Sequence, residues 1–243
     1  MTSLYDRIGL NYSDLRRPDP RIAVAIDAAL GGARTVLNVG AGAGSYEPSG
    51  RAVTALEPSI EMIRQRKVPA AAIVQGRAED LPFADLSFDS AMAVLTVHHW
   101  ADQARGLEEM RRVTQGPVVL LTFDPAFRGF WLADYFPGLV TLDEAQMPAM
   151  SDYERPLGPI AISPVPIPHD CTDGFLAAYW RRPAAYLDPR VRAAMSSFGA
   201  LGDVSGALAR LESDLESGVW ADRYGGLLAL ESLDCGYRLV ATL

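Results

Sequence analysis

The sequence lacks the residues and runs that define several classes of protein. It holds only two cysteines, Cys171 and Cys235, and neither has a His or Cys neighbour at metal-ligand spacing. We therefore expect neither a disulfide framework nor a metal site, and interpret both thiols as small buried hydrophobes. No stretch approaches the roughly 20 apolar residues that a membrane helix needs. The N-terminus also lacks the basic start and apolar run of a secretory signal, so a cytoplasmic protein with no membrane partner is predicted.

An excess of basic residues is missing as well. The chain has 22 Lys and Arg against 30 Asp and Glu, a formal charge of −8, which repels a phosphate backbone. Nucleic acid is therefore not an expected partner. Of the 243 residues, 49% are hydrophobic, enough to bury the core of one large α/β domain. We predict a single domain over residues 1–243, and the sequence leaves its oligomeric state open.

Short apolar runs alternate with helical patterns in the first half of the chain. We expect strands at residues 35–39, 52–56, 71–74, 88–95 and 118–123, and helices at residues 59–67 and 104–112. Ser59 is an expected helix cap. This alternation predicts an α/β fold with a doubly wound, mostly parallel sheet, in which ligands bind beyond the carboxyl ends of the strands. Residues 20–124 are the expected cofactor-binding core.

The second half of the chain is richer in proline and aromatic residues. Residues 125–232 are expected to form a helical, aromatic-rich cap and the substrate-side elements. Within and after the cap we expect a strand at residues 165–168, helices at residues 173–180, 189–198 and 204–217, and a terminal strand at residues 237–242. The candidate substrate-pocket residues are Asp124, Trp131, Phe136, Tyr179 and Trp180. For the aromatic residues among them, ordinary core packing is an equal alternative, and Asp124 is also suited to open an Asp-Pro turn.

A glycine-rich loop follows the first expected strand. Gly40, Gly42 and Gly44 let the backbone turn sharply and approach a ligand closely. The dinucleotide fingerprint is not met, because its third glycine comes one residue early here. Only residues 45–51 separate the loop from the next strand, and they include a proline and a glycine, so no full helix is expected to hold a pyrophosphate there. A phosphate-free nucleoside such as S-adenosylmethionine suits this loop better than a nicotinamide dinucleotide.

Two carboxylates follow the next two expected strands. Glu57 lies 17 residues after Gly40, where a carboxylate can accept hydrogen bonds from both ribose hydroxyls. Glu79 lies where an adenine edge can be read. The alternatives are an exposed acidic residue before a turn for Glu57 and a solvated acidic turn for Glu79.

Four segments in this order resemble the motifs of one family. They are residues 38–44, residues 56–59 with Met62, residues 76–89, and residues 95–100. Together they resemble the class I S-adenosylmethionine-dependent methyltransferases, in the group that includes quinone-biosynthesis enzymes and many small-molecule methyltransferases. The resemblance spans about residues 35–123, with weaker similarity at residues 5–17. It implies a Rossmann-like, seven-stranded sheet whose final strand is antiparallel, and S-adenosylmethionine as cofactor with S-adenosylhomocysteine as product.

The resemblance also implies a set of cofactor-binding residues at the matching positions. They are Tyr12, Asn38, Gly40, Ala41, Gly42, Gly44, Glu57, Pro58, Ser59, Met62, Ala78, Glu79, Leu95 and Thr96. Three features depart from the family pattern: Asn38 stands where an acidic residue is usual, Arg77 replaces a frequent acidic residue, and the first crossover helix is truncated. The N-terminal segment, with Tyr5, Tyr12, Arg16 and Arg17, is therefore a candidate cover for the cofactor. A surface helix ending at Pro18 is the alternative.

The expected reaction is in-line methyl transfer to a small, apolar acceptor that is uncharged or cationic. His98 and His99 lie at the mouth of the expected site, so either imidazole is a candidate base. The alternative is that both rings pack or hydrogen-bond beneath the loop. Two other functions stay open: a protein that binds S-adenosylmethionine without transferring its methyl group, and, less favoured by the loop, a nicotinamide-dependent reductase.

Overall fold

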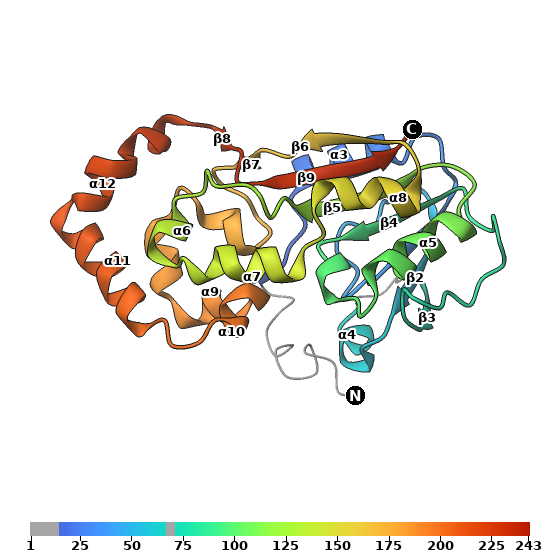
Figure 1. Cartoon of the computed structure of the whole chain (residues 1–243), viewed down its shortest axis with the longest axis horizontal. Coiled ribbons are helices and arrows are strands. Elements are labelled where there is room, and N and C mark those ends of the chain that lie inside the picture. The colour runs from blue at the N-terminus through green and yellow to red at the C-terminus, as the bar shows by residue number, and fades with distance from the viewer. Residues whose placement is uncertain (1–14, 67–70) are drawn as a thin grey trace.

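A seven-stranded sheet occupies one half of the molecule (Figure 1). This computed structural model describes residues 15–66 and 71–243. The strands lie in the order β3-β2-β1-β4-β5-β9-β6. They are β1 (Thr35–Val39), β2 (Ala52–Glu57), β3 (Ala72–Gln75), β4 (Ser90–Val94), β5 (Val118–Phe123), β6 (Ile160–Pro164) and β9 (Tyr237–Thr242).

Strands β1 to β5 are parallel to one another, whereas β9 is antiparallel to both β5 and β6. Asn38 near the end of β1 lies beside Ala55 of β2 and Met92 of β4. The ends of these three strands therefore meet at one edge of the sheet. The predicted fold class, a doubly wound and mostly parallel seven-stranded sheet with a final antiparallel strand, is confirmed.

Helices cover both faces of this sheet (Figure 1). On one face, Ile22 and Ile26 of α3 (Pro20–Ala29) pack in the same buried cluster as β-strand residues such as Leu121. On the other, α5 (Gln103–Val113) and α8 (Glu154–Leu157) bury Met110 and Leu157 against the sheet. The side chain of Ser59 accepts a hydrogen bond from the Met62 amide at the start of α4 (Ile60–Arg64), which confirms the predicted cap.

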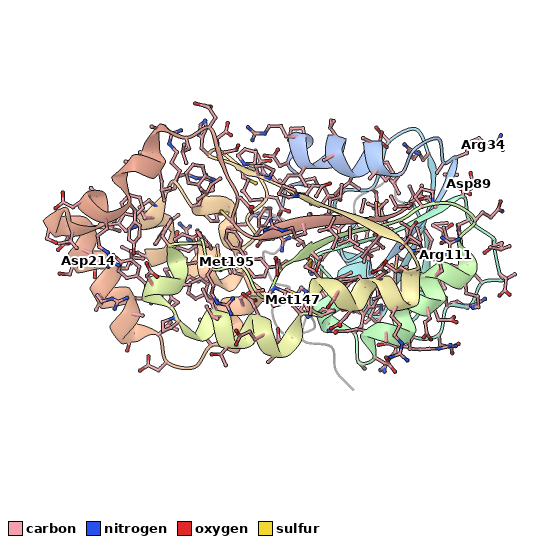
Figure 2. All side chains as sticks on the ribbon, turned by 45° about the horizontal axis from the view of Figure 1, so that its top comes forward. Arg34, Asp89, Arg111, Met147, Met195 and Asp214 are labelled. Atoms are coloured by element: carbon pink, nitrogen blue, oxygen red, sulfur yellow. The ribbon has the colours of Figure 1, made fainter. Side chains whose placement is uncertain are left out.

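The other half of the molecule is a cap built from short helices. They are α6 (Leu132–Tyr135), α7 (Gly138–Gln146), α9 (Pro189–Ala193), α10 (Ser196–Ala200), α11 (Ser205–Ser217) and α12 (Val219–Tyr224), with 3₁₀ turns at Leu176–Tyr179, Pro183–Leu187 and Gly225–Ala229. One buried cluster contains residues of both the cap and the sheet. In Figure 2, Met195 and Asp214 lie in the cap, and Arg34 and Asp89, at the amino ends of β1 and β4, lie at the far end of the molecule. The carboxyl ends of the strands therefore point toward the cap.

The strand predicted at residues 165–168 is wrong in position. The sheet strand is β6 (Ile160–Pro164), and within the predicted segment only β7 (Ile167–Pro168) pairs, with β8 (Ser232–Leu233) in a separate two-stranded sheet. Most of β6 is exposed, so it lacks the apolar run of a buried strand. Its terminal proline is tolerated because the strand lies at the sheet edge.

Two predicted cap helices also differ from the structure. Residues 173–180 contain only the 3₁₀ turn Leu176–Tyr179, since Asp173 is fixed by distant partners instead of by a helix. Residues 189–198 form two short helices, α9 and α10, rather than one. The helix α3 was not predicted, although Asp19 caps it and Pro20 occupies its first turn, which is a typical start signal. Within residues 15–66 and 71–243, no helix is long and apolar enough to cross a membrane.

Candidate cofactor site

A cavity of about 640 Å³ opens at the carboxyl ends of β1, β2 and β4. This volume lies in the range of small-molecule and cofactor sites. Its walls come from the glycine loop, the turn after β2, the loop after β3 and the turn after β4. The sequence analysis placed the site at these loops, and the fold brings them together.

The glycine loop leaves its strand through a conformation that only glycine adopts easily. Gly40 has a φ of +68°, and a Cβ added there would lie 2.2 Å from the Thr96 Oγ1. The amides of Gly40 and Ala41 both donate to the Leu56 carbonyl, at 2.9 and 3.0 Å. The loop is therefore held against the end of β2, and the residues that follow form turns without a helix, as predicted.

Glu57 fixes the two sides of the cavity to each other. Its carboxylate accepts hydrogen bonds from the Gly42 amide and the Ser59 amide, both at 2.8 Å. Glu57 is buried and lines the cavity. The carboxylate thus joins the glycine loop to the start of α4 and faces the space where a ligand would lie.

Asn38 is linked to a charged pair behind the glycine loop. Its Nδ2 donates to Glu47 Oε1 at 3.2 Å. Arg66 Nη2 donates to both carboxylate oxygens of Glu47, at 2.6 and 2.7 Å, and its Nη1 donates to the Gly42 carbonyl at 3.3 Å. Because the amide nitrogen of Asn38 points to Glu47, its amide oxygen is the group left to accept a hydrogen bond in the cavity.

A second polar network closes the end of the cavity near the N-terminal segment. Arg16 Nε donates to Asp173 Oδ1 at 2.5 Å, and the Tyr46 hydroxyl donates to Asp173 Oδ2 at 2.9 Å. Asp173 is fully buried, while Arg16 and Tyr46 both line the cavity. This network ties Arg16, the connection after the glycine loop and the cap together through one carboxylate.

Backbone strain is concentrated at this site. Among the described residues, the non-glycine residues with positive φ are Tyr46, Leu86 and Leu95. Tyr46 and Leu95 line the cavity. Such conformations cost of order 1–3 kcal/mol and gather where the surrounding structure enforces them for function.

Glu79 and the histidines complete the rim. Glu79 Oε1 accepts from the amides of Ala101 and Asp102, at 2.7 and 3.2 Å, so it shapes the turn before α5. The rings of His98 and His99 lie 3.8 Å apart between centroids, but only His99 lines the cavity. Desolvation and the charge of Arg16 lower the pKa of His99 to about 4. Desolvation, followed by the effects of His99 and Arg16, lowers the pKa of His98 well below its usual value.

Most of the residues expected at the cofactor line the cavity. They are Asn38, Gly40, Ala41, Gly42, Glu57, Pro58, Met62, Ala78, Glu79, Leu95 and Thr96. Gly44 and Ser59 do not: Gly44 packs beside Arg66, and Ser59 caps α4. Tyr12 and Tyr5 lie outside the described residues. Arg77 is an exposed part of the lining.

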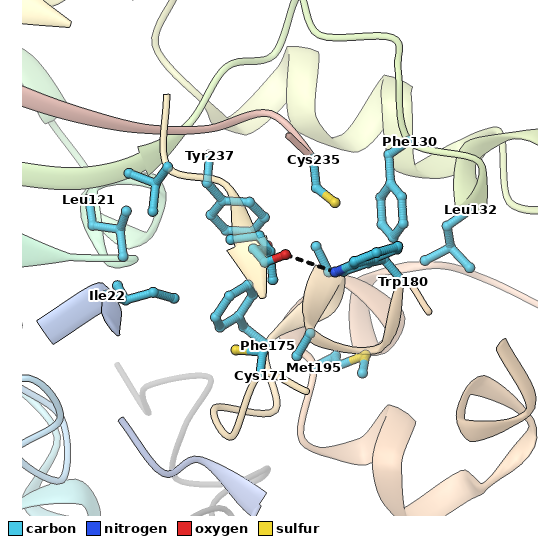
Figure 3. Close-up of a cluster of buried hydrophobic side chains, with 14 of the residues drawn as sticks. Ile22, Leu121, Phe130, Leu132, Cys171, Phe175, Trp180, Met195, Cys235 and Tyr237 are labelled. Atoms are coloured by element: carbon cyan, nitrogen blue, oxygen red, sulfur yellow. Dashed lines mark hydrogen bonds between the residues drawn. The ribbon is translucent and has the colours of Figure 1, made fainter. Parts of the chain in front are cut away.

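None of the residues expected in the substrate pocket lines this cavity. Trp131, Phe136 and Trp180 are buried in the hydrophobic core. Figure 3 shows Trp180 in this core, with its indole N–H donating to the Ile167 carbonyl at 2.9 Å. Tyr179 packs partly buried against the same core, and Asp124 opens a turn by accepting from the Ala126 amide. For the three buried aromatics, the structure favours the core alternative.

Sequence reasoning missed three residues of the site: Tyr46, Glu47 and Asp173. Tyr46 and Asp173 have distant partners, since 127 residues separate Tyr46 from Asp173 and 157 separate Arg16 from Asp173. No local pattern announces such pairs. Glu47 could have been found, because it lies in the short connection after the glycine loop, close in sequence to Asn38.

Comparison with known proteins identifies the family. A methyltransferase-domain family model matches residues 37–120. A solved structure of a protein from Anabaena variabilis, assigned as a methyltransferase of an antibiotic biosynthesis pathway, is 36% identical with a TM-score of 0.87. It covers 94% of this chain, and this chain covers 99% of it. The chain therefore belongs to the class I S-adenosylmethionine-dependent methyltransferases.

Curated relatives match over part of their length. A demethylmenaquinone methyltransferase of Paenarthrobacter aurescens is 31% identical over 50% of this chain and 51% of its own. A ubiquinone/menaquinone biosynthesis C-methyltransferase of Geotalea daltonii is 36% identical over 44% of this chain and 46% of its own. The chain spans between a quarter and about half of the length of the curated relatives it matches.

Proposed function

We propose that this chain transfers a methyl group from S-adenosylmethionine to a small-molecule acceptor. The observation that carries the proposal is the cavity of about 640 Å³ formed by the glycine loop and Glu57 at the carboxyl ends of β1, β2 and β4. The family to which the chain belongs and the absence of a helix after the glycine loop support a phosphate-free nucleoside as its ligand.

The residues of the cavity fit both ends of this cofactor. Glu57 supplies a carboxylate for ribose hydroxyls, while Met62 and Ala78 supply apolar wall for a base. At the other end, the guanidinium of Arg16, which is already paired with Asp173, can also donate to a carboxylate, and the Asn38 amide oxygen can accept from an ammonium group. Gly40 lets the loop lie against the Thr96 side chain more closely than any Cβ would allow.

When bound, the cofactor would supply a methyl group on a sulfonium, and its sulfur would be left as a neutral thioether. The protein's main contribution is to hold the acceptor in line, since orientation can supply roughly 7–11 kcal/mol of the barrier. An effective base has a pKa near the operating pH. His99 has a pKa of about 4 and is therefore a weak base at neutral pH, so the proposed role of His99 is to shape the rim.

Calorimetric titration with S-adenosylhomocysteine tests the proposal. The parent chain should bind it, Gly42→Val should abolish binding by filling the loop, and Glu57→Gln should weaken binding. Glu108→Gln, which changes an exposed carboxylate on α5, is the matched control and should bind like the parent. Failure of the parent to bind, or equal binding by all four proteins, would refute the proposed site.

A further inference from the structure

A second, smaller cavity of about 30 Å³ lies between the end of β5, α7 and the start of β9. Four aromatic rings contribute to its wall: Phe123, Phe127, Phe130 and Tyr237. The carboxylate of Asp143 on α7 also lines it. Phe130 and Tyr237 are seen in Figure 3 within the cluster of buried side chains. The volume suits the end group of a molecule, since a single water needs roughly 10–15 Å³ of such space.

The backbone carbonyl of Asp143 accepts from the Met147 amide at 2.8 Å, but its carboxylate has no hydrogen bond or ion pair from any described residue. Two positive charges are near the cavity: Arg128 lines it and acts on Asp143, and the guanidinium of Arg238 lies over the Phe127 ring, 5.4 Å from its centroid. The guanidinium of Arg128 is already engaged by Glu144 and by the carbonyls of Pro125 and Phe127. Burial raises the pKa of Asp143 to about 7. A carboxylate kept in this setting without a partner is expected at a functional position.

The small cavity and the large cavity lie at the ends of neighbouring strands of the sheet. Strands β1, β4 and β5 are neighbours, and the Leu95 amide donates to the Leu121 carbonyl at 2.8 Å. Val94, which lines the large cavity, and Phe123, which lines the small one, pack against the same hydrophobic cluster on one face of the sheet. The small cavity therefore lies at the end of β5, next to β4, which is followed by Leu95 and Thr96 in the wall of the large cavity.

An aromatic enclosure with one free carboxylate favours a particular kind of ligand. Aromatic faces attract ammonium groups, and the attraction grows when the site is desolvated. The carboxylate adds a charge-assisted hydrogen bond. We infer that Asp143 and the rings of Phe123, Phe127, Phe130 and Tyr237 bind the amine of the methyl acceptor, so that the substrate is a primary or secondary amine. This inference rests on the proposed function.

The arrangement gives Asp143 a place in the reaction. The ammonium group of the acceptor donates a proton to the Asp143 carboxylate, which frees the lone pair of the nitrogen. A bond forms between this nitrogen and the methyl carbon as the sulfur–carbon bond breaks, and its electron pair stays on sulfur. The products are a methylated ammonium and a neutral thioether, and Asp143 releases its proton to water.

Binding of ethylammonium in the presence of S-adenosylhomocysteine tests this inference, with ethanol as the neutral probe of similar size. Chemical-shift titration of the protein should give saturable binding of ethylammonium and none of ethanol. Asp143→Asn should weaken ethylammonium binding at least tenfold, and Phe127→Leu, which keeps the carboxylate, about 3–10-fold. Asp222→Asn, an exposed change on α12, should leave it unchanged.

The outcomes separate the two proposals. If S-adenosylhomocysteine binds but ethylammonium binds no better than ethanol, or binds Asp143→Asn as well as the parent, the amine subsite is wrong and the proposed function stands. If S-adenosylhomocysteine itself fails to bind, the proposed function is wrong. Turnover of alcohols or phenols but no amines in an acceptor panel would likewise overturn the amine assignment.

Discussion

Replacing Gly40 by alanine should destabilise the protein through two separate effects. The φ of +68° at this position disfavours any residue with a Cβ, at a cost of roughly 1–2 kcal/mol. The added methyl group would also lie 2.2 Å from the Thr96 Oγ1 and 2.9 Å from its Cγ2. Overpacking of this kind typically costs about 1–3 kcal/mol, so the total loss should reach about 2–5 kcal/mol.

Gly50 offers a matched control for this variant. Its φ is +87°, but an added Cβ would meet nothing within 4 Å, so Gly50→Ala carries the backbone effect alone. Thermal unfolding should show a loss of roughly 2–8 °C for Gly50→Ala and roughly 4–20 °C for Gly40→Ala, given about 2–4 °C per kcal/mol in a domain of this size. Adding Thr96→Ala should recover part of the second loss. Equal losses for the two glycine variants, or no recovery, would refute the clash.

Three further predictions concern polar groups near the two cavities. Tyr46→Phe removes the hydroxyl that donates to the buried Asp173 carboxylate and should cost about 1.5–3 kcal/mol in denaturant unfolding; an unchanged midpoint would contradict this. His99 has a pKa below that of the unfolded chain, so the unfolded state takes up the proton first. Stability should fall from pH 6.5 toward pH 4 more steeply in the parent than in His99→Gln, and parallel profiles would argue otherwise. The pKa of Asp143 is raised to about 7, so its contribution to the stability of the fold is favourable at low pH and is lost as the pH rises through about 4 to 7. Asp143→Asn should therefore melt at a higher temperature than the parent at pH 8 but not at pH 4. A lower melting temperature for the variant at pH 8 would count against the unpaired carboxylate.

The strands of the sheet could be predicted where they are buried and where the local sequence alone marks their ends. The strands β1 and β5 have the predicted bounds, because each is a continuous apolar run between clear breaks. The strand β6 could not be found this way. It lies at the edge, most of it is exposed, and its place is decided by pairing with β9 some 80 residues away in the chain.

The position of the cavity could also be predicted, because the local sequence marks the ends of the strands around it. Its motif residues follow directly after strands, so their positions in the fold follow from the order of those strands. The aromatic residues of the cap gave no such guide. Trp131 and Trp180 were equally suited to a pocket or a core, and the indole N–H of each is satisfied by a backbone carbonyl within the core. Only the packing of distant segments decides between these alternatives.

Asn38 departs from the family pattern, and its neighbours give a physical reason for the amide. The position lacks the usual negative charge, but the side chain donates to Glu47, whose carboxylate is held by Arg66. An aspartate at position 38 would face the Glu47 carboxylate at the distance of a hydrogen bond, and two such groups cannot both ionise without strong repulsion. The amide removes that repulsion and donates to the carboxylate instead. Asn38, Glu47 and Arg66 therefore act as one unit, in which the charge of Glu47 is balanced by Arg66 behind the glycine loop.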